Sequence, residues 1–280
     1  NLKTGRQYTE SYDKLILSMG AEPIKPPIKG IDSDRVFTIR NIPDTLKIKN
    51  YIDEKSAKSA VVVGGGYIGV EMAENLKLAG LDVTIVELAD HVIGPLDIEM
   101  ACEVHRYIRG KGVKLVLSNG VKEIEEVGNK LIVKLNNNSI ETDIVIMSVG
   151  VRPETQLAKD AGLELNARGS IIVNEHMETS EKDIYAVGDA VEVMDFVTGV
   201  KAFIPLAGPA NRQGRIAADN ICGIKSKYSG TQGSSILKVF DMTVAMTGIN
   251  ERTAKALGLK YDKVYTYSSS HAGYYPGSTY

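Results

Sequence analysis

Apolar runs alternate with amphipathic stretches through the first half of the chain. Residues 59–63 and 82–86 are largely apolar and predict two strands, whereas residues 67–79 carry apolar side chains at helical spacing and predict a helix between them. A second helix is expected at 98–111, followed by a strand at 113–117. Strands that alternate with helices in this way are typical of an α/β fold with a parallel sheet.

A hairpin signal interrupts this alternation. Residues 121–127 and 130–135 alternate apolar and polar side chains on either side of Gly128 and Asn129, a pair that favours a tight turn. A last strand of this region is expected at 142–149. We therefore expect a domain that adds an antiparallel hairpin to a parallel sheet.

The remaining segments carry weaker signals, and the proline-rich stretch 21–27 excludes regular structure near the start. The further elements expected are strands at 7–10, 12–19, 170–173, 183–189, 236–240 and 244–247, and helices at 45–51, 209–222 and 251–257.

Three glycines lie between the first strand of the α/β region and its helix. Gly64, Gly66 and Gly69 have the spacing G-x-G-x-x-G, which is frequent by chance in a chain with 27 glycines but far less so between a strand and a helix. There Gly64 permits a tight turn, Gly66 lets backbone N–H groups approach a pyrophosphate, and Gly69 lets helix and strand pack closely. The pattern predicts a Rossmann-like dinucleotide-binding unit; three unrelated loop glycines are the weaker alternative.

Glu87 follows the second strand of this unit, about 20 residues after the glycines, where a carboxylate can accept hydrogen bonds from the adenosine ribose. Residues 87–91 hold two carboxylates and no Lys or Arg to pair with a 2′-phosphate. We therefore expect NADH to be preferred over NADPH. A basic side chain from a distant loop would reverse that preference.

Composition limits the partners. The 280 residues carry 33 Lys and Arg against 35 Asp and Glu, and a net charge of −2 gives no field for nucleic acid or an anionic membrane. No apolar run approaches the roughly 18 residues of a membrane span, and a cytoplasmic protein is expected. Cys102 and Cys222 are far apart and are expected to be buried structural thiols. The four histidines show no metal-ligand spacing, so no metal is expected.

Asp189 ends the predicted strand at 183–189 and precedes a helix. A carboxylate at the carboxyl end of a strand is well placed to bind a hydroxylated ligand in an open α/β sheet. An Asp that caps a turn or helix is the alternative, and it would be preferred without the neighbouring segments.

Five segments together resemble the flavin-dependent pyridine nucleotide-disulfide oxidoreductases, and within them the branch of coenzyme A disulfide reductases and NADH oxidases. They are YDKLILSMGA (12–21), GGGYIGVE (64–71), VGVRP (149–153), DIYAVGD (183–189) and IPLA (204–207), and the resemblance covers nearly the whole chain. It implies an NAD domain inserted in an FAD domain and followed by an interface domain. The implied parts are the flanks of a partial FAD domain at 1–41 and 152–230, the NAD domain at 42–151, and a truncated α+β dimerisation domain at 231–280.

The resemblance also implies residue roles. Asp189 would hold the ribityl hydroxyls of FAD, and the backbone at Leu206 and Ala207 would face an oxygen of the flavin ring. The other matching positions expected near the cofactors are Ser18, Gly20, Gly150 and Gly188.

Tyr67 and Glu71 begin the helix after the glycines. By resemblance, Tyr67 covers the flavin until nicotinamide displaces it, and Glu71 pairs with a lysine beside flavin N5 that this sequence does not reveal. A tyrosine that packs on a neighbouring element is the alternative for Tyr67.

The resemblance breaks down at the start of the chain. The family begins with its own FAD-binding G-x-G-x-x-G and carries one or two redox cysteines soon after it, and neither feature precedes Asn1. Cys102 and Cys222 cannot take that role by position. We therefore expect an excised fragment that is colourless and inactive on its own.

Tyr274 and Tyr275 lie in residues 271–277, which resemble a loop that coenzyme A disulfide reductases place near the partner subunit's active site. Tyrosines there can contact coenzyme A or give a proton to a leaving thiolate. Packing at an interface is an equal alternative.

The first functional hypothesis is a homodimeric enzyme in which hydride passes from NADH to FAD and electrons then pass to a disulfide such as coenzyme A disulfide. The alternative within the family is an NADH oxidase or peroxidase that reduces O₂ or H₂O₂. The alternative from another class is a non-catalytic module that binds NADH.

Overall fold

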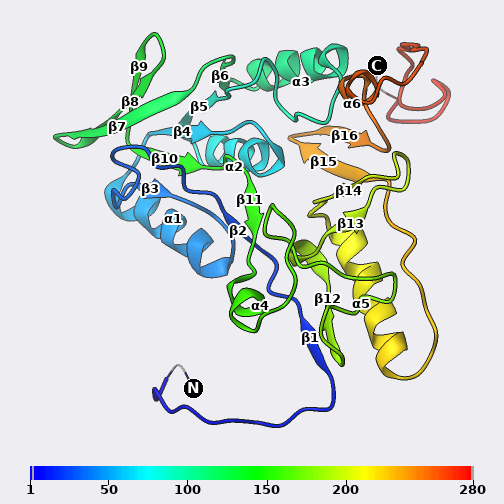
Figure 1. The fold of residues 1–280 in the computed structure, drawn as a ribbon. Coiled ribbons are helices and arrows are strands. Elements are labelled where there is room, and N and C mark those ends of the chain that lie inside the picture. Colours follow the sequence, from blue (N-terminus) through cyan, green and yellow to red (C-terminus); the bar gives the residue numbers. More distant parts are fainter. Residues whose placement is uncertain (2, 279–280) are drawn as a thin grey trace. The chain divides into compact units, whose positions relative to one another are not determined.

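A five-stranded parallel sheet organises the larger part of the molecule (Figure 1). The structure is a computed structural model that describes residues 1 and 3–278, and it divides into two units, 1–248 and 249–280, each of which is described by itself. All neighbouring strands of the sheet are parallel, which confirms the expected α/β fold. Their order is β3 (Val36–Phe37), β10 (Ile144–Met147), β4 (Ser59–Val63), β5 (Asp82–Val86) and β6 (Lys114–Val116).

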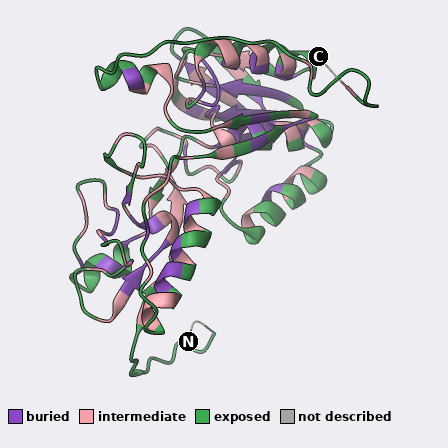
Figure 2. Ribbon diagram, turned by 90° about the vertical axis from the view of Figure 1, so that its right-hand side faces the viewer, coloured by how far each residue is buried: buried purple, intermediate pink, exposed green. Residues whose placement is uncertain are grey.

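Separate apolar clusters cover the two faces of this sheet. On one face, Val62, Ile85 and Ile146 pack with residues of three helices. On the other face, Val61 and Met147 pack with an antiparallel sheet. Because successive side chains of a strand point to opposite faces, strands that are apolar throughout can be buried on both, as Figure 2 shows. The three helices are α1 (Ile42–Lys55), α2 (Tyr67–Leu78) and α3 (Ile98–Gly110).

The ends of the helices follow local signals. Asn41 caps α1 and forms a reciprocal capping box with Asp44, so the helix begins earlier than the expected residue 45. The chain leaves α2 at Gly80, whose φ of +89° favours glycine.

The predicted hairpin is part of a three-stranded antiparallel sheet of β7 (Val121–Val127), β8 (Lys130–Leu135) and β9 (Ser139–Thr142). The single strand expected at 142–149 is wrong, because the chain divides at Asp143 into β9 and β10. The Asp143 carboxylate accepts backbone N–H groups of Lys58 at 2.9 Å and Ser59 at 3.0 Å, and it pairs with Lys130 at 2.7 Å. One partly buried carboxylate thus ties β4 and β8 to the break between β9 and β10.

Segments far apart in sequence form a second part of the first unit, which we call the flank region (residues 15–23 and 151–222). β1 (Leu15–Leu17) pairs in parallel with β12 (Ile184–Ala186), and β2 (Ala21–Pro23) pairs antiparallel with β11 (Val151–Pro153). Its own core includes Ile171, Met177 and Tyr185. A domain divided between two distant segments requires such pairings. The boundaries of its two parts, 1–41 and 152–230, stay a prediction. The other elements are α4 (Gln156–Asp160), the 3₁₀ turn Gly188–Ala190, β13 (Val193–Met194), β14 (Lys201–Ala202) and α5 (Ala207–Ile221).

Several further predictions need correction. Residues 21–27 do not exclude regular structure, because Ala21–Pro23 form β2 and find backbone partners in β11. Residues 7–10 form no strand, since they are exposed and have no partner strand. Residues 170–173 contribute only isolated bridges at Ile171. The strand expected at 12–19 is reduced to β1, because only those residues have backbone partners in β12.

An antiparallel hairpin of β15 (Ser235–Val239) and β16 (Met242–Met246) completes the first unit. Its Leu237 and Val244 belong to the same cluster as Leu76 of α2, and Glu74 of α2 accepts the Phe240 N–H at 2.7 Å. The hairpin therefore packs on the helix side of the parallel sheet.

The second unit holds one helix, α6 (Glu251–Ala256), whose N-cap Asn250 accepts the Thr253 N–H at 2.8 Å. Residues 257–278 form no helix or strand.

Candidate functional site

The glycine loop between β4 and α2 is tightly packed at two of its three motif glycines. Gly64 has a φ of +105°, and a Cβ there would lie 2.3 Å from the carbonyl oxygen of Ser148. A Cβ on Gly69 would lie 1.9 Å from the carbonyl oxygen of Gly64. Only glycine fits at either position, as the tight turn and the close helix–strand contact of the predicted unit require.

Gly66 differs from the other two. It is the N-cap of α2, no side chain caps its helix, and a Cβ there would meet nothing within 4 Å. No side chain therefore caps the first N–H groups of α2 at the positive end of the helix. This arrangement fits a phosphate group.

Glu87 lies directly after β5 and touches the glycine loop. One carboxylate oxygen accepts the Gly65 N–H at 2.5 Å, and the other accepts the Ala89 N–H at 2.8 Å. The contact with the loop was not predicted from the sequence. Each carboxylate oxygen has a further lone pair, so Glu87 can also accept a hydrogen bond from a ribose hydroxyl. That contact stays a prediction.

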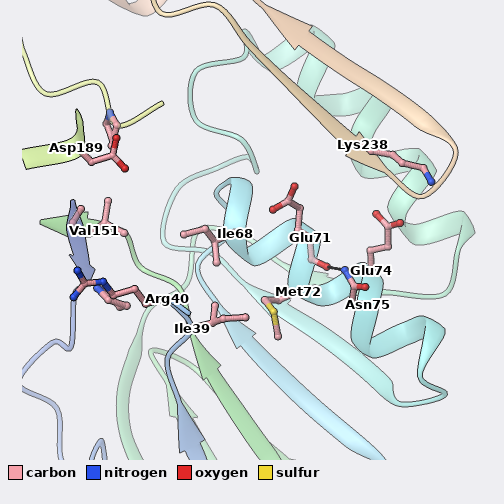
Figure 3. Close-up of a pocket in the computed structure, with 13 residues that line it drawn as sticks. Ile39, Arg40, Ile68, Glu71, Met72, Glu74, Asn75, Val151, Asp189 and Lys238 are labelled. Carbon is pink, nitrogen blue, oxygen red and sulfur yellow. Dashed lines mark hydrogen bonds between the residues drawn. The ribbon is translucent and has the colours of Figure 1, made fainter. Parts of the chain in front are cut away.

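A cavity of about 620 Å³ lies where α2 faces the flank region (Figure 3). Ile68 and Glu71 of α2 line it together with Asp189, which follows β12. The other lining residues are Ala21, Pro23, Ile39, Arg40, Met72, Glu74, Asn75, Val151, Pro205 and Lys238. The structure thus brings two predicted site residues, Glu71 and Asp189, to one cavity.

Both carboxyl groups are partly desolvated. Burial raises the pKa of Glu71, and the neighbouring Glu74 raises it further. Burial alone raises the pKa of Asp189, whose carboxylate accepts no hydrogen bond within the described part of the chain. A ligand that donates hydrogen bonds would therefore be favoured at Asp189.

The turn that carries Asp189 is fixed by a residue that sequence reasoning missed. Gln213 on α5 is 1% exposed, and its Oε1 accepts the Gly188 N–H at 2.7 Å. Gly188 has a φ of +78°. No local pattern marks Gln213, because its partner is 25 residues away. At the start of the same helix, Leu206 is the N-cap and makes no side-chain cap, which leaves the amides near Ala207 available.

We call residues 36–147, which hold the parallel sheet, α1 to α3 and the β7–β9 sheet, the nucleotide unit. The chain passes between the nucleotide unit and the flank region near Gly20 and Gly150, and other predicted cofactor residues lie at these two chain crossings. Gly20 has a φ of +77° and its carbonyl accepts the Glu154 N–H, while Gly150 has a φ of +115° and accepts the Ile24 N–H. Ser18 follows β1 directly and is exposed. Their contacts with a cofactor stay predictions.

Arg40 is a second residue that the sequence did not reveal. Its guanidinium donates to the Met19 carbonyl at 2.8 Å and pairs with Glu154 at 2.5 Å. It also lines the cavity. Arg40 therefore links the segment before α1 to both chain crossings.

The Tyr67 hydroxyl lies 2.9 Å from Ser235 Oγ and donates to Met246 Sδ at 3.3 Å. This is the packing contact that the alternative interpretation of Tyr67 expects. A gating role stays a prediction.

Tyr274 and Tyr275 belong to the second unit. Their ring centroids are 4.7 Å apart, and the residues are 82% and 58% exposed. Both rings are accessible to a ligand or an interface, and their roles stay predictions.

The prediction for the cysteines is wrong, since Cys102 and Cys222 are both exposed. The buried face of α3 carries Ala101, Val104 and Ile108, so Cys102 points away from it. Among the described residues, no three His, Cys, Asp or Glu side chains gather to hold a metal ion. None of the described helices is long and apolar enough to cross a membrane.

Known proteins share this arrangement. The family model of pyridine nucleotide-disulphide oxidoreductases matches residues 1–214. An NADH oxidase of Methanocaldococcus jannaschii is 41% identical over 98% of this chain and 61% of its own length. A coenzyme A disulfide reductase of Staphylococcus haemolyticus is 35% identical over 100% of this chain and 62% of its own length. The crystal structure of reduced Bacillus anthracis CoADR-RHD has a TM-score of 0.95 and 52% identity, over 99% of this chain and 50% of that one.

The similarity extends through both the nucleotide unit and the flank region. The chain spans about 60% of the length of the two relatives, 61% and 62%. Its mixed α/β fold with parallel sheets is shared with about half of the solved structure. The chain belongs to the pyridine nucleotide-disulphide oxidoreductase family.

Proposed function

We propose that this chain forms the dinucleotide- and flavin-contacting part of an FAD-dependent NAD(P)H oxidoreductase. The observation that carries the proposal is the cavity that Ile68 and Glu71 of α2 share with Asp189 of the flank region. Hydride transfer requires the two reacting rings to meet, and here two candidate binding elements border one space. The family uses FAD together with NADH or NADPH.

The glycine loop and Glu87 are the proposed dinucleotide site. The uncapped first turn of α2 at Gly66 would bind the pyrophosphate, and Glu87 would accept the adenosine ribose hydroxyls. We propose NADH as the preferred cofactor, because the Glu87 carboxylate would repel a 2′-phosphate.

The flavin site is proposed at Asp189 and the start of α5. The Asp189 carboxylate has no donor within the described residues, which suits ribityl hydroxyls, and the amides at Leu206 and Ala207 suit a ring oxygen. A bound flavin supplies a two-electron carrier between the nicotinamide and the final acceptor. Glu71 presents a partly desolvated carboxylate, which a cation at the edge of the cavity would stabilise.

For the final acceptor we propose a disulfide such as coenzyme A disulfide, reduced by a homodimer of the whole protein. The exposed Tyr274 and Tyr275 support this choice as contacts for coenzyme A or as proton donors. An NADH oxidase is the second candidate, and the relative of that name at 41% identity favours it. A non-catalytic NADH-binding module is the candidate from another class.

Calorimetric titration of the 280-residue chain tests the dinucleotide site. NADH should bind more tightly than NADPH, and Glu87→Ala should weaken binding and erode the preference. Glu87→Gln is the control for the charge, because it keeps an acceptor for the Gly65 N–H and removes the charge, with the loss of the acceptor for the Ala89 N–H. It should improve NADPH binding while NADH binding changes less. Equal affinity of the unmodified chain for both cofactors would contradict the assignment.

Two further measurements separate the candidates. The purified chain is expected to be colourless, and about one FAD per chain would overturn that expectation. Turnover of the natural protein with coenzyme A disulfide, O₂ and H₂O₂ then distinguishes the acceptors, and NADH binding without turnover on any of them would favour the binding module.

A further inference from the structure

Two buried histidines lie behind the glycine loop. His105 on α3 is 5% exposed, and His91, in the segment after β5, is 8% exposed. The Nε2 atom of His105 accepts the Val92 N–H at 3.1 Å. An imidazole nitrogen accepts a hydrogen bond only when it carries no proton. The contact therefore requires a neutral His105 with its proton on Nδ1.

Ile93, the residue after Val92, contacts the glycine loop directly. Ile93 donates its N–H to the Gly65 carbonyl at 2.8 Å, while Glu87 accepts the Gly65 N–H at 2.5 Å. A Cβ on Gly65 would lie 2.8 Å from Val92 Cγ1, so Val92 packs directly on the loop. Residues 87–93 therefore hold both backbone groups of Gly65.

Ile93 shows that this segment is constrained. Its φ is +53°, a left-handed conformation that a β-branched residue rarely adopts, and it is fully buried. Such a conformation persists only where the surroundings impose it. Loss of the adjacent Val92 hydrogen bond should let the segment relax.

The charged and titratable groups that face His105 are Arg109 on its own helix and His91 and Asp90 on the segment after β5. Burial, Arg109 and His91 lower the pKa of His105 from 6.5, and Asp90 raises it less. The neutral form that the Val92 contact requires is thus favoured at neutral pH. It is lost as the pH falls through the lowered pKa.

We propose that His105 is a positioning residue for dinucleotide binding, which holds the Gly65 turn in its phosphate-binding form through Val92 and Ile93. The inference rests on the proposed dinucleotide site. Protonation at Nε2 would place two donors face to face, so the segment would have to move and the ligand would bind less tightly. By linkage, bound ligand must oppose protonation of His105 by the same factor.

ADP-ribose is the probe, because it carries the pyrophosphate and the adenosine ribose but lacks the acid-labile dihydronicotinamide. Its dissociation constant for the chain is measured between about pH 8 and about pH 5, the range in which histidines titrate. We expect a constant value in the upper part of the range and a rise of about tenfold in the lower part. Proton resonances of the four histidines should show His105 titrating at lower pH with ADP-ribose bound.

Two substitutions separate the two roles of His105, as a hydrogen-bond acceptor for Val92 and as a group that titrates. His105→Gln offers an acceptor that does not titrate, so binding at about pH 8 should be retained and its pH dependence lost. His105→Leu removes the acceptor and should weaken binding about tenfold at every pH. His176→Gln, in the flank region, is the control and should change neither property.

The proposal is overturned if the ADP-ribose affinity of His105→Gln still depends on pH. It is also overturned if His105 titrates at the same pH with and without ADP-ribose. Failure of the unmodified chain to bind ADP-ribose at about pH 8 would instead remove the proposed dinucleotide site. Amide exchange at Val92 in the ligand-free chain is a separate readout of the contact. It should accelerate about tenfold in His105→Leu but not in His105→Gln, and equal rates in both would show that His105 does not hold the segment.

Discussion

The nucleotide unit and the flank region are built in opposite ways. In the nucleotide unit, the glycine loop and the segment that holds it lie within residues 64–93. In the flank region, β1 finds its partner β12 some 170 residues later, with the whole nucleotide unit in between. The segment that holds the glycine loop is therefore local, although Ser148 also contacts Gly64, whereas the β1–β12 pair forms only when the chain closes a long loop.

This difference has a consequence for stability. Closing a long loop costs conformational entropy before any distant contact forms, and β1 and β12 provide only three register pairs in return. Arg40 adds a tie by joining Met19 and Glu154 at the chain crossings. We expect the flank region to open more readily than the nucleotide unit.

The largest effect is expected inside the nucleotide unit. Gly69→Ala would place a Cβ 1.9 Å from a backbone oxygen of Gly64, so α2 must move away from β4. We expect the free energy of unfolding to fall by about 3 kcal/mol and dinucleotide binding to be lost. Urea unfolding and calorimetry measure the two effects.

Gly66→Ala is the matched control for that substitution. Its Cβ would meet nothing within 4 Å, and the φ of −73° suits any residue. We expect a stability change below about 0.5 kcal/mol together with weaker NADH binding. Similar losses of stability in both variants would contradict the distinct roles of the two glycines.

The next largest effect is the loss of stability at acidic pH that Asp143 causes. Burial opposes ionisation of Asp143, but Lys130, the Lys58 and Ser59 amides and the Ser59 hydroxyl outweigh it and lower the pKa from 3.8 to about 2. Because the folded-state pKa is depressed, the stabilisation is present above about pH 4 and is lost as the pH falls towards 2.

Asp143→Asn should therefore lower the free energy of unfolding by about 2 kcal/mol at neutral pH. The difference from the unmodified chain should shrink as the pH falls through the same window. Urea unfolding at several pH values checks this, and a difference that does not depend on pH would show that the charge of Asp143 is not its source.

A smaller effect is expected in the flank region. Gln213→Leu would leave the Gly188 N–H buried without an acceptor, at a cost of about 1.5 kcal/mol. Amide exchange should accelerate at residues 188–190, whereas ADP-ribose affinity should not change. Equal acceleration of amide exchange in residues 64–66 would show that the two regions open together. The flank region would then not open more readily than the nucleotide unit.

Local patterns predicted the nucleotide unit well. β7 and β8 have the predicted bounds, because alternation and the Gly128–Asn129 turn fix both strands within a few residues. α2 begins at Tyr67 as predicted, directly after its N-cap Gly66. In these cases the partners that determine the structure are close in sequence.

Distant partners explain what the sequence could not show. The break at Asp143 depends on backbone amides 84 and 85 residues away. Gln213 and Arg40 are ordinary helix and loop residues until the fold brings Gly188 and Met19 to them. The Val92 contact was hidden for a similar reason, since His105 resembles any other polar residue on an amphipathic helix.

The smallest effect is expected at Tyr67, where it separates packing from gating. Tyr67→Phe removes the bond to Ser235 but keeps the ring, so the chain should lose about 0.5–1 kcal/mol of unfolding free energy. A gate works through the ring of Tyr67, so Tyr67→Phe in the natural protein loaded with FAD should keep its rate of flavin reduction by NADH. Tyr67→Ala should alter that rate in stopped-flow measurements while leaving the FAD content unchanged. If Tyr67→Ala reduces flavin at the unmodified rate, Tyr67 only joins α2 to the β15–β16 hairpin, and the gating role is removed.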